Sequence, residues 1–410
     1  MNAQIINFIQ QHCKDDVQQL ALQSKKYPDV DMPLALQQIA GWQAAQHKLP
    51  TWATNLKLIY PPHLSMEQCS SEQTARYKVK LVQQVCSHLK ENKLLPFGSA
   101  NIATSLVDLT GGFGVDFSFM ASAFHKAVYV EQQQVLCDIA QHNFPLLGIN
   151  NATVVCCDSA QYLQSMPVST IIFIDPARRD AHGGKTVAIS NCTPNLLTLL
   201  PLLLSKSLFT LVKLSPMLDW HQAIAQLNEQ ENCVRQIHIV SINNECKELL
   251  LVLSKKWQEP LSLHCVNNDE VFVSYPQNQS VSVSANEVIS AQYIGQYLYE
   301  PNASIMKAGC FSALVQQYPI KKIAPNSHLF ISSYNIDNFP GRKFQISSCS
   351  SMNKKMLKAQ LSHINKANIT VRNFPLTVAQ LRQRLHIKEG GGIYIFATTD
   401  ATKKHWLLIC

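Results

Sequence analysis

The sequence predicts an α/β protein in which a doubly wound, Rossmann-like sheet follows a helical N-terminal region and precedes small α+β domains. Between residues 104 and 255, short apolar runs alternate with helical stretches. That pattern is typical of strands buried on both faces of a parallel sheet. A glycine-rich turn, "DLTGGFGVD" (108–116), follows the first run, at the place where a doubly wound fold binds its ligand. The length of 410 residues allows several such domains.

Residues 1–95 are predicted to form a helical domain. "INFIQQHCKDDVQQLALQ" and "PLALQQIAGWQAAQHKL" place apolar residues three and four positions apart, as one face of a helix requires. The Pro-Pro pair at 61–62 excludes a helix at that point. After it, Ser71 or Ser70 can cap a helix that continues to Leu89.

Residues 96–258 are predicted to form the sheet domain. Its candidate strands are "SLVDL", "AVYVE", "ATVVCC", "TIIFID", "FTLVKLS", "RQIHIVSI" and "ELLLVLS". Strand–helix–strand alternation predicts parallel pairing for the early members. Only "NNECK" separates the last two runs, so we expect these two to form an antiparallel hairpin.

After residue 260 the pattern indicates smaller α+β domains, which we divide into 259–315 and 316–410. Short strands are expected at "VFVSY", "VSVSA", "HLFISS", "KFQISS", "ANITVRNFP", "GIYIFATT" and "HWLLIC". The helical patterns here are "NKKMLKAQLSHINKA" and "TVAQLRQRL".

Charge is distributed unevenly along the chain. Residues 301–410 contain fifteen Lys and Arg against three Asp and Glu, whereas the first 300 residues contain 20 against 24. A basic C-terminal part indicates a polyanion partner, although cations can also simply keep a surface soluble. Cations interleaved with Phe and Tyr suit phosphate contact and base stacking. The candidates are Lys354, Lys355, Lys358, Arg372, Arg382 and Arg384.

Other classes of protein are disfavoured. No apolar run is long enough for a membrane span, and the N-terminus lacks the features of a signal peptide, so we expect a cytoplasmic protein. The thirteen cysteines include no Cys-x-x-Cys pair, so neither a disulfide framework nor a metal site is expected.

The glycine-rich turn predicts a nucleotide-like cofactor. Gly111, Gly112 and Gly114 allow the backbone to approach a ligand closely. Twenty residues after Gly111, Glu131 ends the second strand, where an acid can accept hydrogen bonds from ribose hydroxyls. These features fit either a dinucleotide or S-adenosylmethionine.

Acids at the ends of three other strands favour S-adenosylmethionine. Asp108 can reach the ammonium group of that cofactor but would repel a pyrophosphate. Asp158 can accept from the adenine amino group, and Asp175 ends the fourth strand. Each acid taken alone could instead cap a helix. Thr110 and Asp116, in the same glycine-rich segment, complete the predicted cofactor-binding set.

With these motifs, residues 104–255 resemble a class I S-adenosylmethionine-dependent methyltransferase. Asp108, Gly111 and Gly114 match its first motif, Glu131 its second, Asp158 its third and "DPAR" its fourth. The whole chain is similar to a narrower bacterial family of methyltransferase-like proteins with a ferredoxin-like insert and a THUMP-like C-terminal domain. The stretches that carry this resemblance are "EQCSSEQTARYK" (67–78), "DLTGGFGVD", "IDPARRD", "KLSPMLD", "YEPNASIMKAG", "NFPGR" and "RNFPLTVAQLR".

The resemblance implies the fold, the cofactor and an RNA partner, because THUMP domains elsewhere bind structured RNA. It assigns the ferredoxin-like module to 259–315 and the THUMP-like domain to 316–410. The function it predicts is methylation of a nucleobase in structured RNA, either rRNA or tRNA.

Within "IIFIDPARRD", the predicted catalytic residues are Asp175, Pro176 and Arg178. Enzymes of this fold that methylate amino groups carry Pro-Pro-aromatic after this acid, whereas this chain has Pro-Ala-Arg. An arginine can stack on a base or hold a phosphate, so we expect Arg178 and Arg179 to bind substrate, together with Lys213 of "VKLSPMLD". Arg178 can alternatively form a structural ion pair.

Several alternatives stay open. Cys192 of "SNCTPN" is a less favoured candidate nucleophile for carbon methylation, since Pro194 in the first turn of a helix, capped by Thr193 or Asn191, explains that string without chemistry. The function itself has three alternatives: a non-catalytic RNA-binding protein with a Rossmann-like core, a methyltransferase for a protein or small molecule, and a nicotinamide-dependent dehydrogenase.

Overall fold

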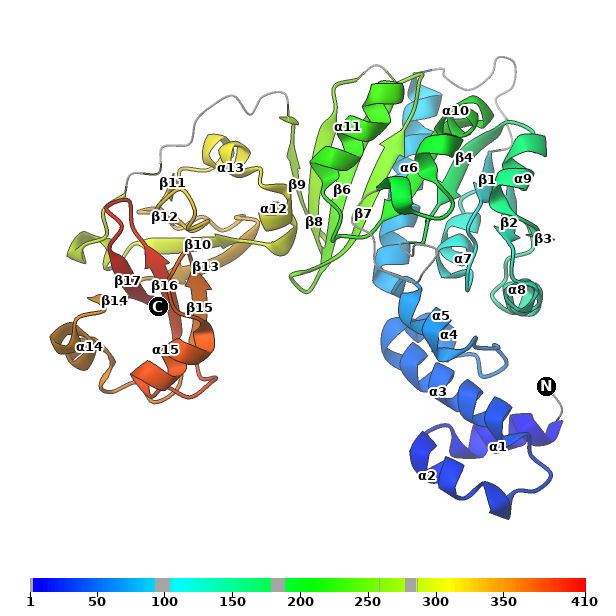
Figure 1. The fold of residues 1–410 in the computed structure, drawn as a ribbon, viewed down its shortest axis with the longest axis horizontal. Coiled ribbons are helices and arrows are strands. Elements are labelled where there is room, and N and C mark those ends of the chain that lie inside the picture. The colour runs from blue at the N-terminus through cyan, green and yellow to red at the C-terminus, as the bar shows by residue number, and fades with distance from the viewer. Residues whose placement is uncertain (1–2, 93–103, 178–188, 258, 277–284, 286) are drawn as a thin grey trace. The chain divides into compact units, whose positions relative to one another are not determined.

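The computed structural model describes residues 3–92, 104–177, 189–257, 259–276, 285 and 287–410. The chain divides into two compact units (Figure 1). The first comprises Met1–Ile237 and Lys247–Pro260, and the second His238–Cys246 and Leu261–Cys410. None of the helices in the described ranges combines the length and apolar character needed to span a membrane.

The N-terminal region of the first unit is helical, as predicted. Its α-helices are α1 (Ala3–His12), α2 (Val17–Leu22), α3 (Met32–Lys48), α4 (Pro50–Ala53), α5 (His63–Gln68) and α6 (Glu72–Glu91). The predicted start of α6 is confirmed, because Ser71 Oγ accepts a hydrogen bond from the amide of Thr74 at 3.3 Å. This bond satisfies one of the free N–H groups at the helix start.

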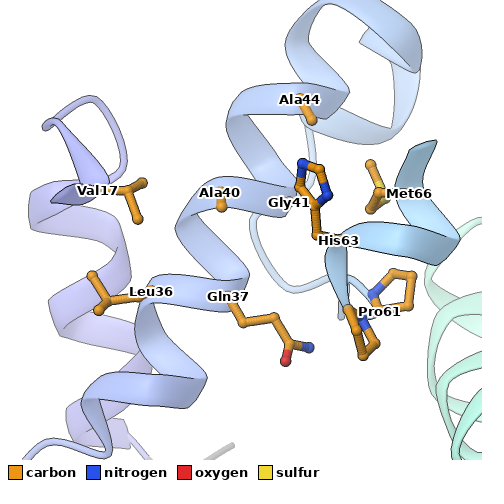
Figure 2. A pocket seen from close by; sticks show the side chains of 10 residues that line it. Val17, Leu36, Gln37, Ala40, Gly41, Ala44, Pro61, His63 and Met66 are labelled. Atoms are coloured by element: carbon orange, nitrogen blue, oxygen red, sulfur yellow. The ribbon is translucent and has the colours of Figure 1, made fainter. Parts of the chain in front are cut away.

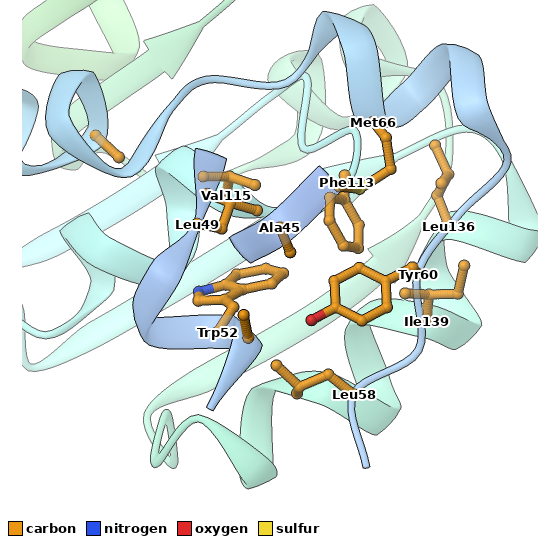
Figure 3. Packing of buried hydrophobic residues seen from close by; sticks show 12 residues of the cluster. Ala45, Leu49, Trp52, Leu58, Tyr60, Met66, Phe113, Val115, Leu136 and Ile139 are labelled. Atoms are coloured by element: carbon orange, nitrogen blue, oxygen red, sulfur yellow. The ribbon is translucent and has the colours of Figure 1, made fainter. Parts of the chain in front are cut away.

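A buried cluster joins the helical region to the sheet domain (Figure 3). Trp52 and Tyr60 come from the helical region and pack around Phe113, which lies within the glycine-rich turn. The ring centroids of Trp52 and Phe113 are 5.0 Å apart in an edge-to-face arrangement, a favourable geometry for aromatic pairs. The helical region therefore helps to hold the glycine-rich turn in place.

The sheet of the first unit confirms the predicted doubly wound fold. Its strands are β1 (Ser105–Asp108), β2 (Lys126–Glu131), β3 (Ala152–Cys156), β4 (Ser169–Ile174), β5 (Ser207–Leu214), β6 (Val234–Ile242) and β7 (Glu245–Leu253). The sheet has nine strands in the described ranges, and these seven follow the order β3-β2-β1-β4-β5-β7-β6 within it. Strands β1 to β5 pair in parallel. The order reverses between β1 and β4, which is where such sheets bind ligands.

The helices between these strands are α7 (Val115–Ala121), α8 (Gln134–Leu146), α9 (Ser159–Ser165), α10 (Leu196–Lys206) and α11 (Trp220–Gln230). The predicted helix cap at Asn191 or Thr193 is wrong. Helix α10 begins later, and Asn195 Oδ1 accepts from the Thr198 amide at 3.2 Å. Pro194 precedes the capping residue Asn195 and therefore lies outside the helix.

Strand β7 of the sheet domain runs antiparallel to its neighbour β5, whereas β5 itself pairs in parallel with β4. The turn that joins β6 to β7 contains Asn243 and Asn244, whose φ angles are 51° and 63°. Asparagine tolerates this left-handed conformation better than most residues, and two such residues in succession are typical of tight hairpins.

The second unit is built from short strands and helices. These are β8 (Ser262–Asn267), β9 (Glu270–Ser274), β10 (Tyr297–Pro301), α12 (Ala303–Ala308), α13 (Phe311–Gln317), β11 (Lys321–Lys322), β12 (Phe330–Ser332), β13 (Gly341–Gln345), β14 (Ser348–Ser351), α14 (Lys354–Leu361), β15 (Asn368–Arg372), α15 (Val378–Leu385), β16 (Tyr394–Thr399) and β17 (His405–Ile409). Of the strand expected at "VSVSA", residues 281–284 lie outside the described ranges.

Two four-stranded sheets organise this unit. One has the order β11-β12-β10-β13 and the other β14-β17-β16-β15. A single buried cluster contains residues of both sheets, including Leu298 of β10 and Phe396 of β16. The second sheet also packs against Leu361 of α14 and Leu381 of α15.

Candidate active site

The glycine-rich turn that follows β1 is closed tightly enough to require its glycines. A Cβ atom on Gly111 would lie 2.1 Å from the Tyr129 ring, which leaves no room for a side chain. Gly112 and Gly114 have φ angles of 55° and 83°, a region that residues with a side chain rarely adopt. The turn can therefore bring its backbone against a ligand, as the sequence predicts.

Glu131 at the end of β2 holds this turn. Its Oε2 accepts from the Gly112 amide at 2.9 Å, and its Oε1 accepts from the Gln133 amide at 2.9 Å. The side chain is buried. Each carboxylate oxygen can accept a second hydrogen bond, so a ribose hydroxyl can still be bound here.

Asp108 and Thr110 link the glycine-rich turn to the end of β4. Asp108 Oδ1 accepts from the Thr110 amide at 2.9 Å, and Thr110 Oγ1 accepts from the Asp175 amide at 2.7 Å. Burial raises the pKa of Asp108 well above its usual value. A cationic ligand would therefore be a favourable partner for this carboxylate.

Asp175, Lys213 and Asp116 form a line of alternating charges. Lys213 Nζ lies 2.6 Å from Asp175 Oδ2 and 3.4 Å from Asp116 Oδ2. The Asp175 side chain is 37% exposed, whereas the Lys213 side chain is 11% exposed. Asp175 is therefore the member of the line that a substrate can reach most easily.

Three further residues, which the sequence analysis did not place in the site, extend this line inward. Lys78 Nζ lies 2.9 Å from Asp116 Oδ1 and 2.5 Å from Glu248 Oε2, and its side chain is fully buried. Ser70 Oγ donates to Asp116 Oδ2 at 2.7 Å. Ser70 and Lys78 lie in the stretch 67–78 that carries the family resemblance. Glu248 begins an apolar run, and nothing in the sequence distinguishes it.

The lysines and the acids of this network fix each other's ionisation. Burial alone would raise the pKa of Asp116, but Lys78 and Lys213 outweigh it and lower this pKa to about 2. Burial alone would lower the pKa of Lys213, but Asp175, Asp116 and Glu248 raise it well above its usual value. Lys213 therefore carries its charge at neutral pH.

The four acids of the site outnumber its two lysines. Among the described residues, the cations beside Asp108, Asp116, Asp175 and Glu248 are Lys78 and Lys213. S-adenosylmethionine carries a sulfonium and an ammonium group, so its cationic groups fit this excess of acids, whereas a pyrophosphate does not. The residues present thus suit the cofactor that the sequence predicts.

The remaining candidate residues of the sheet domain are Asp158, Pro176, Cys192, Arg178 and Arg179. Asp158 is exposed and caps α9 by accepting from the Gln161 amide at 3.0 Å, so it has a structural role whether or not it meets adenine. Pro176 and Cys192 are both buried. Arg178 and Arg179 lie outside the described residues.

The candidate RNA-binding cations of the second unit fall into two groups. Arg372 Nη2 lies 2.8 Å from Glu300 Oε1, and the other oxygen of Glu300 is held by Arg342. Arg382 Nη1 donates to the carbonyl of Ala367 at 3.1 Å. The exposed group comprises Lys354, Lys355, Lys358 and Arg384. Arg372 and Arg382 thus already make contacts within the protein, whereas the side chains of the exposed group lie on the surface.

A separate cavity of about 310 Å³ lies in the helical region (Figure 2). Its walls include Val17, Leu36, Gly41, Pro61 and Met66. None of the predicted cofactor or substrate residues lines it. In the described ranges, no three His, Cys, Asp or Glu side chains gather as a metal site would require.

Comparison with known protein families assigns residues 297–410. Residues 297–340 match a family described as a ferredoxin-like domain, and residues 341–410 match a family described as THUMP domain-like. No curated protein matches the sequence.

Solved structures are similar to different shares of this chain, and one is similar to nearly all of it. A candidate methyltransferase from Porphyromonas gingivalis W83 is 30% identical, and the match covers 99% of this chain and 96% of that one with a TM-score of 0.82. An S-adenosylmethionine-dependent methyltransferase from Agrobacterium tumefaciens is 15% identical over 45% of this chain and 61% of its own, with a TM-score of 0.30. A candidate methyltransferase from Streptococcus mutans, solved with SAH, is 11% identical over 37% of this chain and 87% of its own, with a TM-score of 0.29.

The assignment depends on the first of these structures, which is similar over nearly the full length of both chains. The chain therefore belongs to the bacterial family of that protein, in which a class I S-adenosylmethionine-dependent methyltransferase fold is combined with a ferredoxin-like domain and a THUMP-like C-terminal domain.

Proposed function

We propose that the protein transfers a methyl group from S-adenosylmethionine to structured RNA. The observation that carries the proposal is the acid-rich network beside the glycine-rich turn, at the carboxyl ends of β1 and β4. It combines a favourable field for a sulfonium donor with one acid, Asp175, that is open to an acceptor.

Most of the cofactor contacts would come from the first three strand ends. Asp108 would bind the ammonium group, Glu131 the ribose hydroxyls and Asp158 the adenine amino group. The backbone of the turn would approach the ligand closely at its glycines. The predicted set is Asp108, Thr110, Gly111, Gly112, Gly114, Asp116, Glu131, Asp158 and Asp175.

The acceptor would be oriented by Asp175 and Pro176 and bound by Arg178, Arg179 and Lys213. When bound, S-adenosylmethionine supplies an activated methyl group. The protein's own contribution is then mainly to hold the acceptor in line with that group, which removes much of the entropic barrier.

RNA is proposed as the acceptor for two reasons. Residues 341–410 are THUMP domain-like, and THUMP domains elsewhere bind structured RNA. The same part of the chain carries the excess of basic residues, of which Lys354 and Lys355 are exposed on α14. Cations of this kind bind phosphates without reading sequence.

The test is transfer of tritiated methyl groups from S-adenosylmethionine to total RNA from cells that lack the protein. We expect RNase-sensitive label with the unmodified protein and a loss of about 10²–10³-fold with Asp175→Ala. The matched control is Asp138→Ala, which removes an exposed acid from α8. Label in protein or in small molecules would instead identify a different acceptor, and cofactor binding without any transfer would indicate a non-catalytic RNA-binding protein.

A further inference from the structure

Two opposite charges stand side by side where the acceptor is proposed to bind. Lys213 Nζ and Asp175 Oδ2 are 2.6 Å apart, at the carboxyl ends of the adjacent strands β5 and β4. The pair is reached from solvent through Asp175, which is the more exposed of the two. An acceptor that hydrogen-bonds Asp175 therefore also comes close to an ammonium group.

The ammonium group of Lys213 has donor capacity to spare. It carries three N–H groups. Within the described parts of the chain, its acceptors are Asp175 Oδ2 and Asp116 Oδ2. One N–H is left for an atom of the acceptor.

This donor discriminates between nitrogen and oxygen acceptors. The amino nitrogen of a base has a single lone pair, which attacks the methyl group and cannot at the same time accept a hydrogen bond. A hydroxyl oxygen has two lone pairs, so it can accept from Lys213 with one and attack with the other. A cation beside the attacking oxygen also stabilises the negative charge that develops as the proton leaves.

The residues after Asp175 agree with this chemistry. An amino-group acceptor on a base is usually held by stacking on an aromatic side chain. Here Ala177 and Arg178 follow Asp175-Pro176, and an arginine, unlike an aromatic residue, can also hold a phosphate next to a ribose hydroxyl.

We infer that the acceptor is a hydroxyl oxygen of RNA and that Lys213 and Asp175 are its catalytic pair, an inference that rests on the proposed methyl transfer to RNA. Within an RNA chain the hydroxyl that is not esterified is the ribose 2′-hydroxyl. The nucleobase acceptor predicted from the sequence is then the competing outcome.

The proposed transfer is a single displacement at the methyl carbon. A bond forms between the 2′-oxygen and the methyl carbon while the bond between that carbon and the sulfonium sulfur breaks, leaving a neutral thioether. The hydroxyl proton passes to the carboxylate of Asp175 and from its exposed side to water. Lys213 keeps its own proton throughout and stabilises the oxyanion.

The inner residues of the network act as positioning residues for this pair. Lys78 holds both Asp116 and Glu248, and Asp116 in turn lies 3.4 Å from Lys213 Nζ. These buried contacts hold the ammonium group of Lys213 in place beside Asp175.

The first experiment identifies the product of the unmodified protein. RNA labelled with tritiated methyl groups is hydrolysed in alkali, which needs a free 2′-hydroxyl to cut the chain. We expect label in alkali-resistant dinucleotides. Label in mononucleotides with a methylated base overturns the inference and leaves the proposed function standing. No label in RNA, although S-adenosylmethionine binds, overturns the proposed function and this inference with it.

The second experiment assigns the role of Lys213. Lys213→Met should lower kcat by about 10²–10³-fold, while S-adenosylmethionine binding, measured by calorimetry, is retained because the site becomes more acidic. Lys213→Arg keeps a cation and should recover part of the rate. The matched control is Lys126→Met. It removes an exposed lysine at the start of β2, the end away from Glu131 and the site.

A folded Lys213→Met variant that methylates RNA at the normal rate would overturn the assignment. If this variant does not fold, the double variant Lys213→Met with Asp175→Asn removes both charges of the pair and avoids an unpaired carboxylate. The product analysis needs no variant and decides the acceptor in either case.

Discussion

Each unit of the molecule contains a buried carboxylate held between two cations, but the charge balance is opposite. In the first unit Asp116 lies between Lys78 and Lys213, and further acids surround them. In the second unit Glu300 lies between Arg342 and Arg372. The first network has an excess of acids and the second an excess of cations.

A carboxylate held between two cations can suit a cationic ligand in one unit and a phosphate in the other. The side chains of Lys78 and Asp116 are 0% and 10% exposed, and burial of this kind strengthens the field of a charge toward a cationic ligand. Arg342 and Arg372 are 44% and 35% exposed. A guanidinium has five N–H donors, so both arginines can hold Glu300 and still reach a phosphate.

The largest expected effect comes from breaking the inner network. Lys78→Met would leave Asp116 and Glu248 without their shared cation, and breaking a buried ion pair in this way costs about 3–5 kcal/mol. We expect a corresponding loss in the free energy of unfolding by denaturant. The double variant Lys78→Met with Glu248→Gln should recover part of it. Lys90→Met, an exposed lysine on the same helix, is the control. Equal stability of Lys78→Met and the control would contradict the buried ion pairs of Lys78 with Asp116 and Glu248.

The second effect is a loss of folding stability at acidic pH. The pKa of Asp116 is lowered to about 2 in the folded protein, since the two lysines outweigh its burial, against about 3.9 in an unfolded chain. Its ionised form therefore stabilises the fold above pH 4, by about 2 kcal/mol, and this contribution is lost as the pH falls toward 2. Asp116→Asn should flatten the stability profile in that window. An unchanged profile would show that Asp116 is not held as described.

The third effect concerns the network of the second unit. Glu300→Gln should cost about 1–2 kcal/mol, less than a fully buried pair, because both arginines are partly exposed to solvent. Amide hydrogen exchange in β13 and β15 should become about tenfold faster. Glu389→Gln, which removes an exposed acid from the same unit, should leave the exchange unchanged. Equal exchange in both variants would show that Glu300 does not stabilise these strands.

The smallest expected effect concerns the exposed lysines of α14 and their binding to RNA. Replacing Lys354 and Lys355 by Met should weaken RNA binding several-fold and reduce the slope of log K against log salt concentration by about 1–2, as expected for two phosphate contacts. The control replaces Lys25 and Lys26, another exposed adjacent pair. An identical slope for both double variants would remove α14 from the proposed RNA-binding surface.

The sheet domain could be predicted well because its strands are apolar and regularly spaced. All seven runs named in the sequence correspond to β1–β7, and the hairpin of β6 and β7 follows from its short connection. The second unit was harder. Strand β14 is "SCSS" and β11 has two residues, so neither shows the apolar alternation that identifies a strand.

The candidate site could be predicted from the sequence chiefly at strand ends and in the glycine-rich turn. Asp108 and Glu131 end β1 and β2, and Asp175 directly follows β4. Lys78 and Glu248 were not predicted, because an ion pair between residues so distant in sequence appears only when the fold brings them together. The same limit applies to the pairing of Lys213 with Asp175, which changes the chemistry expected at the site.

The backbone after β4 ties the candidate catalytic acid to the start of α10. Ala177 and Thr193 are joined by two backbone hydrogen bonds of 2.8 and 2.9 Å. Asp175 stands two residues before this bridge, and Asn195, which caps α10, stands two residues after it. Because the bridge is made by main-chain atoms, it does not depend on which side chains occupy positions 177 and 193. The placement of Asp175 can therefore survive substitutions at both positions, except by proline, which removes the amide donor.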